Sequence, residues 1–201
     1  MIQGRRRWLA AGLLGLALAA CGRGAAPPPP FKATDITGAE FARDFQLTDH
    51  RGQTRGLADF KGKAVAVFFG YTHCPDACPT TLAELAAAMK QLGPDAERVQ
   101  VLFVTVDPER DTPQLLAQYV PAFHPSFLGL YADAEATARV AKEFKVVYQK
   151  QSGAGQQGYT VDHSAGTYLF DPAGRVRLYV SYGQKAEAFA HDLRLLLHPP
   201  G

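Results

Sequence analysis

The chain has 201 residues, enough for one ordinary domain, with 21 basic and 19 acidic side chains and a formal net charge of +2. Hydrophobic residues make up 47% of the chain and charged residues 20%, which excludes disorder over most of its length. No basic patch follows the first ten residues, so a nucleic-acid-binding protein that acts by neutralising phosphates is excluded. Three cysteines cannot all pair within one chain, so at least one must be free, modified, metal-bound or intermolecular.

The N-terminal segment has the layout of a secretory signal. Three arginines at positions 5–7 precede an apolar run, Trp8–Ala20, which is too short to span a bilayer comfortably. The run ends in Leu-Ala-Ala before Cys21 and resembles the lipobox of bacterial lipoproteins, in which the cysteine is acylated and becomes the mature N-terminus. The alternative is an incidental thiol in an uncleaved anchor. Residues 1–20 are therefore predicted to be a lipoprotein signal peptide.

A proline-rich segment follows the predicted cleavage site. Residues 21–34 contain Pro27–Pro30, which favour a stiff polyproline II spacer. Removal of residues 1–20 leaves 18 basic and 19 acidic side chains, a net charge of −1. We expect residues 21–34 to be a lipidated tether that holds the domain, residues 35–201, on the periplasmic side of the cell membrane. The residue after Cys21 is Gly22 and not the aspartate that holds lipoproteins at the inner membrane, so the choice between inner and outer membrane stays open.

Strand-like and helix-like segments alternate from residue 35 onward. A small hairpin is predicted over 45–55. Residues 64–71 and 99–106 are nearly continuous apolar runs, as expected of strands buried on both faces. Between them, apolar positions at helical spacing predict a helix over 80–92, so these segments form a βαβ unit.

The second half of the chain predicts a hairpin followed by a closing helix. Asp111 is expected to cap a helix ahead of Pro113. The order βαβ followed by ββα indicates a thioredoxin-like fold, a three-layer α/β sandwich, with the N-terminal hairpin added to it. The elements predicted here are helices over 111–120, 133–144 and 185–197 and strands over 127–131, 159–161, 166–170 and 176–182.

Two cysteines, Cys74 and Cys78, lie between the end of a predicted central strand and the start of the following helix. At a helix N-terminus, free backbone N–H groups and the helix dipole lower a thiol pKa and favour the thiolate, which is both a nucleophile and a metal ligand. Sulfurs four residues apart can share a metal or, with some adjustment, form a disulfide. A structural disulfide is the alternative, but one that closes so short a loop stabilises little.

Three segments together resemble the Sco/SenC proteins, copper-handling factors for cytochrome c oxidase assembly. They are Tyr71–Leu82 (YTHCPDACPTTL), Val106–Pro113 (VDPERDTP) and Val161–Gly174 (VDHSAGTYLFDPAG). The resemblance covers residues 45–197. It implies that copper is bound by the two cysteines of a C-x-x-x-C motif and by a distant histidine, which here are Cys74, Cys78 and His163.

The chemistry of these side chains agrees with that implication. Two thiolates and an imidazole form a soft ligand set suited to Cu(I), and able to hold Cu(II) with an added ligand. Zinc accepts the same set, so the ligand types alone do not select copper. His163 is expected in a turn at a sheet end, where ligands are commonly displayed, although a lone loop histidine is more often a surface residue.

Other polar residues near these motifs are weaker candidates. Asp162 is a candidate to orient the imidazole and Asp76 to tune the cysteine loop, but a solvated carboxylate is the default for each. His73 is an alternative ligand or a flanking turn residue, and Met89 is expected to pack in the core. The histidines without motif context, taken as surface residues, are His50, His124, His191 and His198.

Two loops near the predicted site have alternative interpretations. Residues 107–111 are either a recognition loop or a strand-to-helix connection with an Asp cap and a local ion pair. Residues 153–158, rich in glycine and glutamine, suggest a mobile loop that lets His163 approach or leave a metal.

Two functions follow from these features. The first is a membrane-tethered chaperone that binds copper through Cys74, Cys78 and His163 and delivers it to the binuclear site of a cytochrome c oxidase subunit. The alternative is a thiol–disulfide oxidoreductase that reduces the cysteines of that site. Other periplasmic copper chaperones or thioredoxin-like reductases are further candidate partners.

The residues around His163 favour the chaperone. Thioredoxin-type oxidoreductases typically carry a cis-proline facing the cysteines, whereas residues 161–164 contain no proline and present His163 instead. A peroxiredoxin-like peroxidase would need a threonine three residues before its reactive cysteine, and Tyr71 precedes Cys74 at that distance. We therefore expect a metal-binding protein rather than an enzyme.

Overall fold

The computed structural model of the chain describes residues 31–153 and 158–199. The predicted signal peptide over 1–20, the predicted lipidation of Cys21 and residues 21–30 of the predicted tether lie outside these residues and stay predictions. The predicted tether ends too late in the sequence: Phe31 and Ala33 pack against the core, and the backbone N–H groups of Lys32 and Ala33 donate to Asp192, so residues 31–34 belong to the folded domain. Most of the glycine- and glutamine-rich loop lies outside them as well. Among the described helices, none is both long and apolar enough to span a bilayer.

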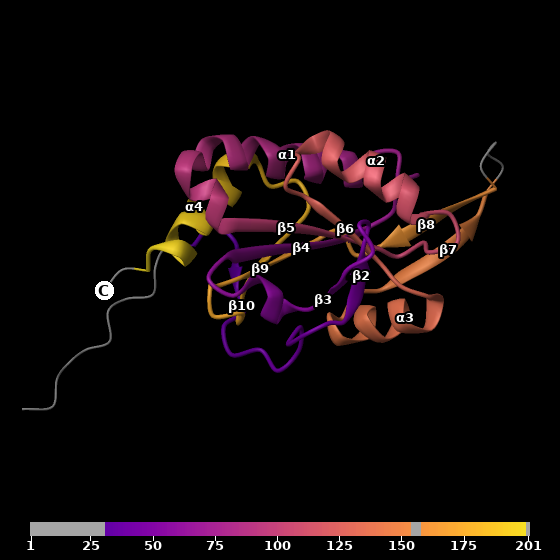
Figure 1. Cartoon of the computed structure of the whole chain (residues 1–201), viewed down its shortest axis with the longest axis horizontal. Helices are drawn as coiled ribbons and strands as arrows, with labels where there is room; N and C mark the ends of the chain where they lie inside the picture. Colours follow the sequence, from indigo (N-terminus) through magenta and orange to yellow (C-terminus); the bar gives the residue numbers. More distant parts are fainter. Residues whose placement is uncertain (1–30, 154–157, 200–201) are drawn as a thin grey trace, which may run out of the picture.

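A mixed eight-stranded sheet forms the middle layer of the molecule, with the strand order β1-β10-β9-β4-β5-β6-β2-β3 (Figure 1). Its central strands, β4 (Ala64–Gly70) and β5 (Val99–Thr105), are parallel and buried at every residue. This confirms both predicted buried strands. The other strands of the sheet are β1 (Thr34–Asp35), β2 (Leu47–Asp49), β3 (Thr54–Arg55), β6 (Leu128–Tyr131), β9 (Thr167–Phe170) and β10 (Val176–Val180).

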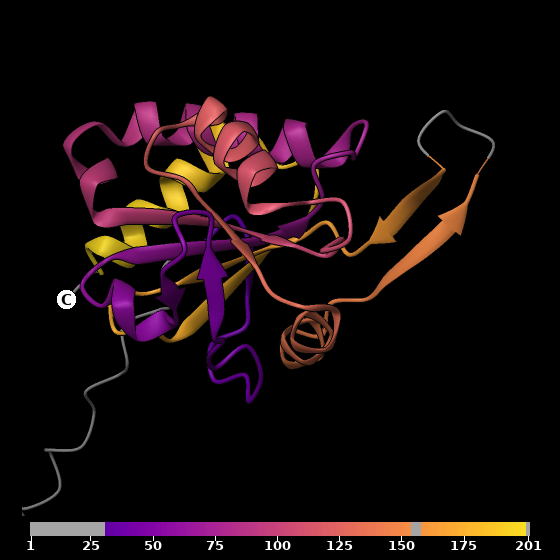
Figure 2. The same ribbon diagram turned by 45° about the vertical axis from the view of Figure 1, so that its right-hand side comes forward.

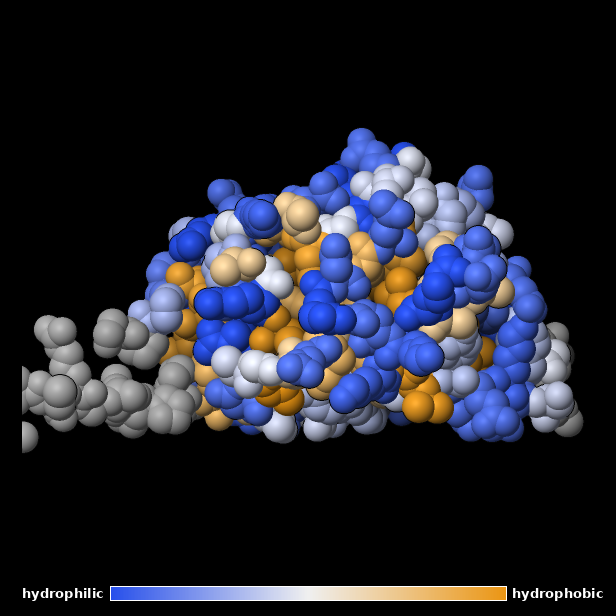
Figure 3. Space-filling model, turned by 90° about the horizontal axis from the view of Figure 1, so that it is seen from below, coloured by the Kyte–Doolittle hydropathy of each residue, from blue (hydrophilic) through white to orange (hydrophobic). Residues whose placement is uncertain are grey.

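Helices cover both faces of this sheet and complete three layers (Figures 1 and 2). On one face lie α1 (Ala77–Leu92), α2 (Pro113–Phe123) and α4 (Ala186–Leu197), and on the other lies α3 (Ala134–Glu143). Seen from the side that carries α3, the surface of the molecule is a mixture of hydrophobic and hydrophilic residues (Figure 3). The predicted thioredoxin-like α/β sandwich is confirmed, and β2 and β3 form the predicted added hairpin at one edge of the sheet.

A separate two-stranded ribbon is the main difference from the sequence prediction. Residues Tyr148–Ser152, a segment whose pattern predicts no strand, form β7, which pairs antiparallel with β8 (Tyr159–His163). The ribbon extends away from the sandwich (Figure 2). Its strands carry mostly exposed polar side chains, so the apolar alternation that indicates a strand is absent from β7.

The start of α2 also differs from the prediction. The predicted cap, Asp111, does not cap the helix; Thr112 does, and its Oγ1 accepts a hydrogen bond from the Leu115 backbone N–H at 3.2 Å. Both residues have side chains that favour helix N-caps, so the pattern alone did not separate them. Asp111 turns inward instead and is 1% exposed.

An aromatic cluster fixes α3 and the start of the ribbon to the sheet. Phe144, directly after α3, is fully buried, and its ring centroid lies 5.1 Å from that of Phe69 on β4 and 5.5 Å from that of Tyr168 on β9. The Tyr168 hydroxyl donates a hydrogen bond to the Phe144 carbonyl oxygen at 2.6 Å. Side chain and backbone of Phe144 are therefore both held, four residues before β7 begins.

We expect Phe144→Ala to lower the free energy of unfolding by about 3 to 5 kcal/mol, because it opens a cavity among buried rings. Chemical denaturation measures this change. The control is Val147→Ala, three residues along the chain at a side chain that is 72% exposed, and it should change stability by less than about 0.5 kcal/mol. Equal stability of the two variants would contradict this account of the cluster.

Candidate metal centre

The cysteine pair lies where β4 passes into α1. Cys74 is half-buried in the loop, and Cys78 is fully buried in the first turn of the helix. The residue at the N-cap position, Asp76, makes no side-chain capping bond. The Cys74 sulfur takes this role, because it accepts a hydrogen bond from the Cys78 backbone N–H at 3.4 Å. The Cys74 sulfur thus lies at the N-terminal end of α1, within reach of a backbone N–H group of its first turn.

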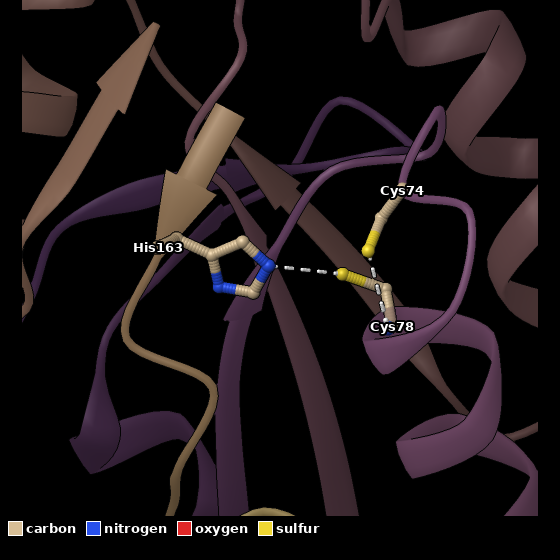
Figure 4. Close-up of side chains that lie close together, drawn as sticks. All are labelled: Cys74, Cys78 and His163. Atoms are coloured by element: carbon tan, nitrogen blue, oxygen red, sulfur yellow. Dashed lines mark hydrogen bonds between the residues drawn. The ribbon is translucent and has the colours of Figure 1, made fainter. Parts of the chain in front are cut away.

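The third side chain, His163, reaches the cysteines from the last residue of β8. Its Nε2 lies 3.3 Å from the Cys78 sulfur, 85 residues away in the chain (Figure 4). Its Nδ1 lies 3.1 Å from the Ser164 carbonyl oxygen, which can only accept. This contact orients the ring so that the Nε2 nitrogen faces the sulfurs, as a ligand atom would.

The two sulfurs and a ring nitrogen of His163 form a compact cluster that can hold a metal ion. All three ligand atoms lie within 4.8 Å of one another. Ligands of a zinc ion, for comparison, lie about 2.0 to 2.3 Å from the metal, so no two of them are more than about 4.6 Å apart. Cys78 forms the buried side of the cluster, whereas Cys74 and His163 are only half-buried and leave an accessible side.

The two thiols have opposite electrostatic environments. The pKa of Cys74 is lowered to about 3, chiefly because the Cys78 thiol donates a hydrogen bond to its sulfur; hydrogen bonds from His163 and from the backbone N–H groups of Asp76 and Cys78 lower it further, against the opposing effect of burial. The pKa of Cys78 is raised by the same hydrogen bond and by burial. The metal-free pair is therefore one thiolate and one thiol, and a metal that binds both sulfurs displaces the proton of Cys78.

Gly70 at the end of β4 makes room for the buried sulfur. A Cβ atom at this position would lie 2.7 Å from the Cys78 sulfur and 2.9 Å from a ring carbon of Phe103, closer than such atoms approach. Gly70 belongs to none of the motifs that the sequence predicts for the site. The available signal was a glycine at the end of an otherwise bulky buried strand, which often marks a close approach.

Asp111, which the sequence predicted as a cap, supports the cysteine loop. Its carboxylate accepts hydrogen bonds from the Thr72 backbone N–H at 3.0 Å, the Thr72 hydroxyl at 2.6 Å and the Thr105 hydroxyl at 2.6 Å. These bonds tie the segment before Cys74 to the end of β5. A buried carboxylate needs such partners, so the contact specifies where the loop begins.

The two carboxylates considered as supports of the site, Asp162 and Asp76, are both exposed, as their default interpretation as solvated groups expects. Asp162 is exposed and accepts a hydrogen bond from Gln151 on the neighbouring strand at 2.9 Å, and the Ser164 carbonyl takes the expected place beside the imidazole. Asp76 is also exposed, and accepts hydrogen bonds from the hydroxyls of Thr80 and Tyr182, each at 3.3 Å.

The remaining histidines lie outside the cluster. His73 faces the Thr72 hydroxyl, with its Nδ1 at 3.0 Å from that oxygen, as a flanking turn residue would. His50 is not a surface residue as expected: it is half-buried, and its Nδ1 accepts a hydrogen bond from the Gly129 backbone N–H. The others pair with neighbouring polar groups: His124 with Ser126, His191 with Asp192 and His198 with Asp95. Met89 is buried, as predicted.

Comparison with known proteins matches the chain to one family along most of its length. The family model described as SCO1/SenC matches residues 33–198. The mitochondrial SCO2 homolog of Bos taurus is 45% identical over 153 residues, which are 75% of this chain and 58% of that protein. An SCO2-like protein of Rickettsia felis is 37% identical over 133 residues, 66% of this chain and 65% of that protein. The chain thus spans less than two thirds of the length of these curated relatives.

Solved structures match over more of their length. Bradyrhizobium japonicum ScoI with copper bound is 40% identical, with a TM-score of 0.67 over 75% of this chain and 96% of that one. The apo Sco1 protein of Thermus thermophilus is 44% identical, with a TM-score of 0.73 over 83% of this chain and 96% of that one.

The low pKa of Cys74 predicts an unusual alkylation profile. Between pH 5 and pH 8 its rate with iodoacetamide should stay nearly constant, whereas the rate of an ordinary thiol, with a pKa of about 8.5, falls about tenfold per unit below that value. Peptide mass spectrometry follows Cys74 alone. Cys78→Ala removes the hydrogen bond that contributes most and should restore a pH-dependent rate. A pH-dependent rate in the parent would show that the thiolate is absent.

Gly70→Ala should displace the Cys78 sulfur. We expect a loss of about 1 to 3 kcal/mol of stability from overpacking, together with a rise in the pKa of Cys74 as its hydrogen-bond donor moves. Denaturation and the alkylation profile measure the two effects. Gly129→Ala in β6 is a matched control, because its Cβ would crowd Leu116 at 3.1 Å and leave the cysteines alone. An unchanged Cys74 profile in Gly70→Ala would refute the close-approach argument.

Proposed function

Because the chain belongs to the SCO1/SenC family, we propose that it binds copper through Cys74, Cys78 and His163. The observation that carries the proposal is the cluster of two sulfurs and a ring nitrogen within 4.8 Å. The copper-bound structures of Bradyrhizobium japonicum ScoI and Arabidopsis thaliana ScoI, at 40% and 32% identity, support copper over zinc for this ligand set.

The states of the three ligands suit both oxidation states of copper. The Cys74 thiolate is ready to bind, and Cu(I), a soft ion, accepts two thiolates once Cys78 has lost its proton. Cu(II) prefers nitrogen ligands in addition, so the imidazole of His163 contributes most to this state. Copper uptake should therefore weaken at low pH, as protons compete for the sulfurs.

We further propose that the protein delivers this copper to the binuclear copper site of a cytochrome c oxidase subunit. The half-buried positions of Cys74 and His163 leave a side on which incoming ligands can replace them one at a time. A lipid on Cys21 and the tether that follows it would confine the domain to a membrane surface on the periplasmic side, which raises its effective concentration near a client in the same compartment.

A thiol–disulfide oxidoreductase is the second candidate, and the Cys74 thiolate is the observation that favours it. A partly exposed thiolate beside a second thiol can attack a disulfide in a client, and Cys78 can then release the client by forming a Cys74–Cys78 disulfide. The client would leave with two reduced cysteines, ready to bind copper.

A copper titration tests the first candidate. In a Cys21→Ser background, the reduced protein should take up one Cu(I) without oxygen, and Cys74→Ser or Cys78→Ser should lower the affinity at least about tenfold, because one of two soft ligands is lost. His163→Ala should lose mainly Cu(II). His73→Ala is the matched control, since this histidine adjoins Cys74 but lies outside the cluster. Cysteine variants that bind copper as tightly as the parent would refute the proposal.

The same variants separate the two functions. A reductase that acts through Cys74 and Cys78 should reduce an oxidised peptide carrying the client's cysteine pair without metal, and His163→Ala should retain that activity. If the metal-free dithiol leaves the peptide oxidised while the copper-loaded protein transfers its ion, the oxidoreductase candidate is wrong.

A further inference from the structure

His163 lies on a two-stranded ribbon, and contacts with the rest of the protein must hold that ribbon in place. Among the strands that the structure describes, β8 pairs with β7 alone, outside the eight-stranded sheet. The ribbon leaves the body of the sandwich and extends outward (Figure 2). A two-stranded ribbon of exposed polar residues has little stability of its own, so contacts between the ribbon and the rest of the protein must keep the imidazole near the thiols.

One side chain, Arg110, connects the ribbon to the loop that follows β5. Its guanidinium carbon lies 3.7 Å from the centroid of the Tyr159 ring, and its Nη1 donates to the Tyr159 carbonyl oxygen at 2.9 Å. Its Nε donates to Asp107 at 2.5 Å, and Asp107 also accepts from the Tyr159 hydroxyl at 2.7 Å. Arg110, Asp107 and Tyr159, the first residue of β8, thus each contact the other two. Asp107 is fully buried.

The same guanidinium also lies near the ring of Tyr71, which packs against His163. Its carbon lies 5.6 Å from the centroid of the Tyr71 ring. That ring, only 2% exposed, meets the imidazole of His163 edge to face, with ring centroids 5.8 Å apart and planes at 89°. Tyr71 therefore packs near both Arg110 and His163, so a change of packing at one affects the other.

We propose that Arg110 is a positioning residue for His163: it clamps Tyr159 against Asp107 and so holds β8 where its last residue reaches the cysteines. The clamp needs a planar group that stacks on a ring while it donates in two directions, which arginine provides and lysine does not. Loss of the clamp frees the imidazole and leaves Cys74 and Cys78 as a two-sulfur site.

The first test needs no metal. In the full-length protein without copper, Arg110→Gln should speed hydrogen exchange of the β8 amides about tenfold, because a stacked, hydrogen-bonded guanidinium contributes on the order of one factor of ten to an equilibrium. Exchange in β8 should accelerate more than exchange in β4, which reports the general loss of stability caused by removing a charged partner of the buried Asp107. Arg139→Gln is the control, since Arg139 is exposed on α3 and pairs with Glu135. Unchanged β8 exchange, or equal acceleration in β4, would overturn the proposal.

The second test rests on the proposed copper function. Arg110→Gln should lose the Cu(II) absorption bands as His163→Ala does, and should still bind one Cu(I). Arg110→Lys keeps the charge without the planar group and should behave like Arg110→Gln. Full Cu(II) binding in Arg110→Gln or Arg110→Lys, or loss of Cu(I) along with Cu(II), would contradict positioning through the clamp. A parent protein that binds no copper would refute the proposed function and leave the exchange test intact.

Discussion

The candidate metal centre depends on one contact between distant segments, the 3.3 Å approach of His163 Nε2 to the Cys78 sulfur across 85 residues of chain. Each partner is held from a different direction. Cys78 lies in the first turn of α1, and its sulfur fits against the end of β4 only because Gly70 has no Cβ. His163 ends a ribbon outside the main sheet, so its position depends on how the ribbon is fastened.

The cysteine loop and the strand that carries His163 both bind the same short loop, residues 107–111, which follows β5. Asp111 binds the backbone and hydroxyl of Thr72 at the start of the cysteine loop, and Asp107 binds Tyr159 at the start of β8 directly and through Arg110. A buried carboxylate lowers the stability of the fold unless its oxygens are paired, so any arrangement that breaks these contacts is unfavourable. The loop acts as a common base on which the sulfur ligands and the imidazole are set relative to each other.

The parts of the fold that follow from local pattern were predictable, and those that follow from long-range contacts were not. Unbroken apolar runs identified β4 and β5, and the predicted position of Cys78 at a helix start is confirmed. His163 was predicted as the third ligand only from the resemblance of three segments to Sco/SenC proteins. In contrast, the polar strand β7 has no apolar alternation, and the role of Asp111 depends on Thr72, 39 residues earlier, which no local pattern reveals.

The central claim is that one copper ion binds both sulfurs and the imidazole within a single chain. X-ray absorption spectroscopy of the copper-loaded protein, with the ion-to-chain ratio and the oligomeric state measured on the same sample, tests it most directly. The account predicts two sulfur neighbours and one imidazole nitrogen around each copper in a monomer, with the nitrogen lost in His163→Ala. Copper bound only by oxygen and nitrogen atoms, or shared between the sulfurs of two chains, would contradict it.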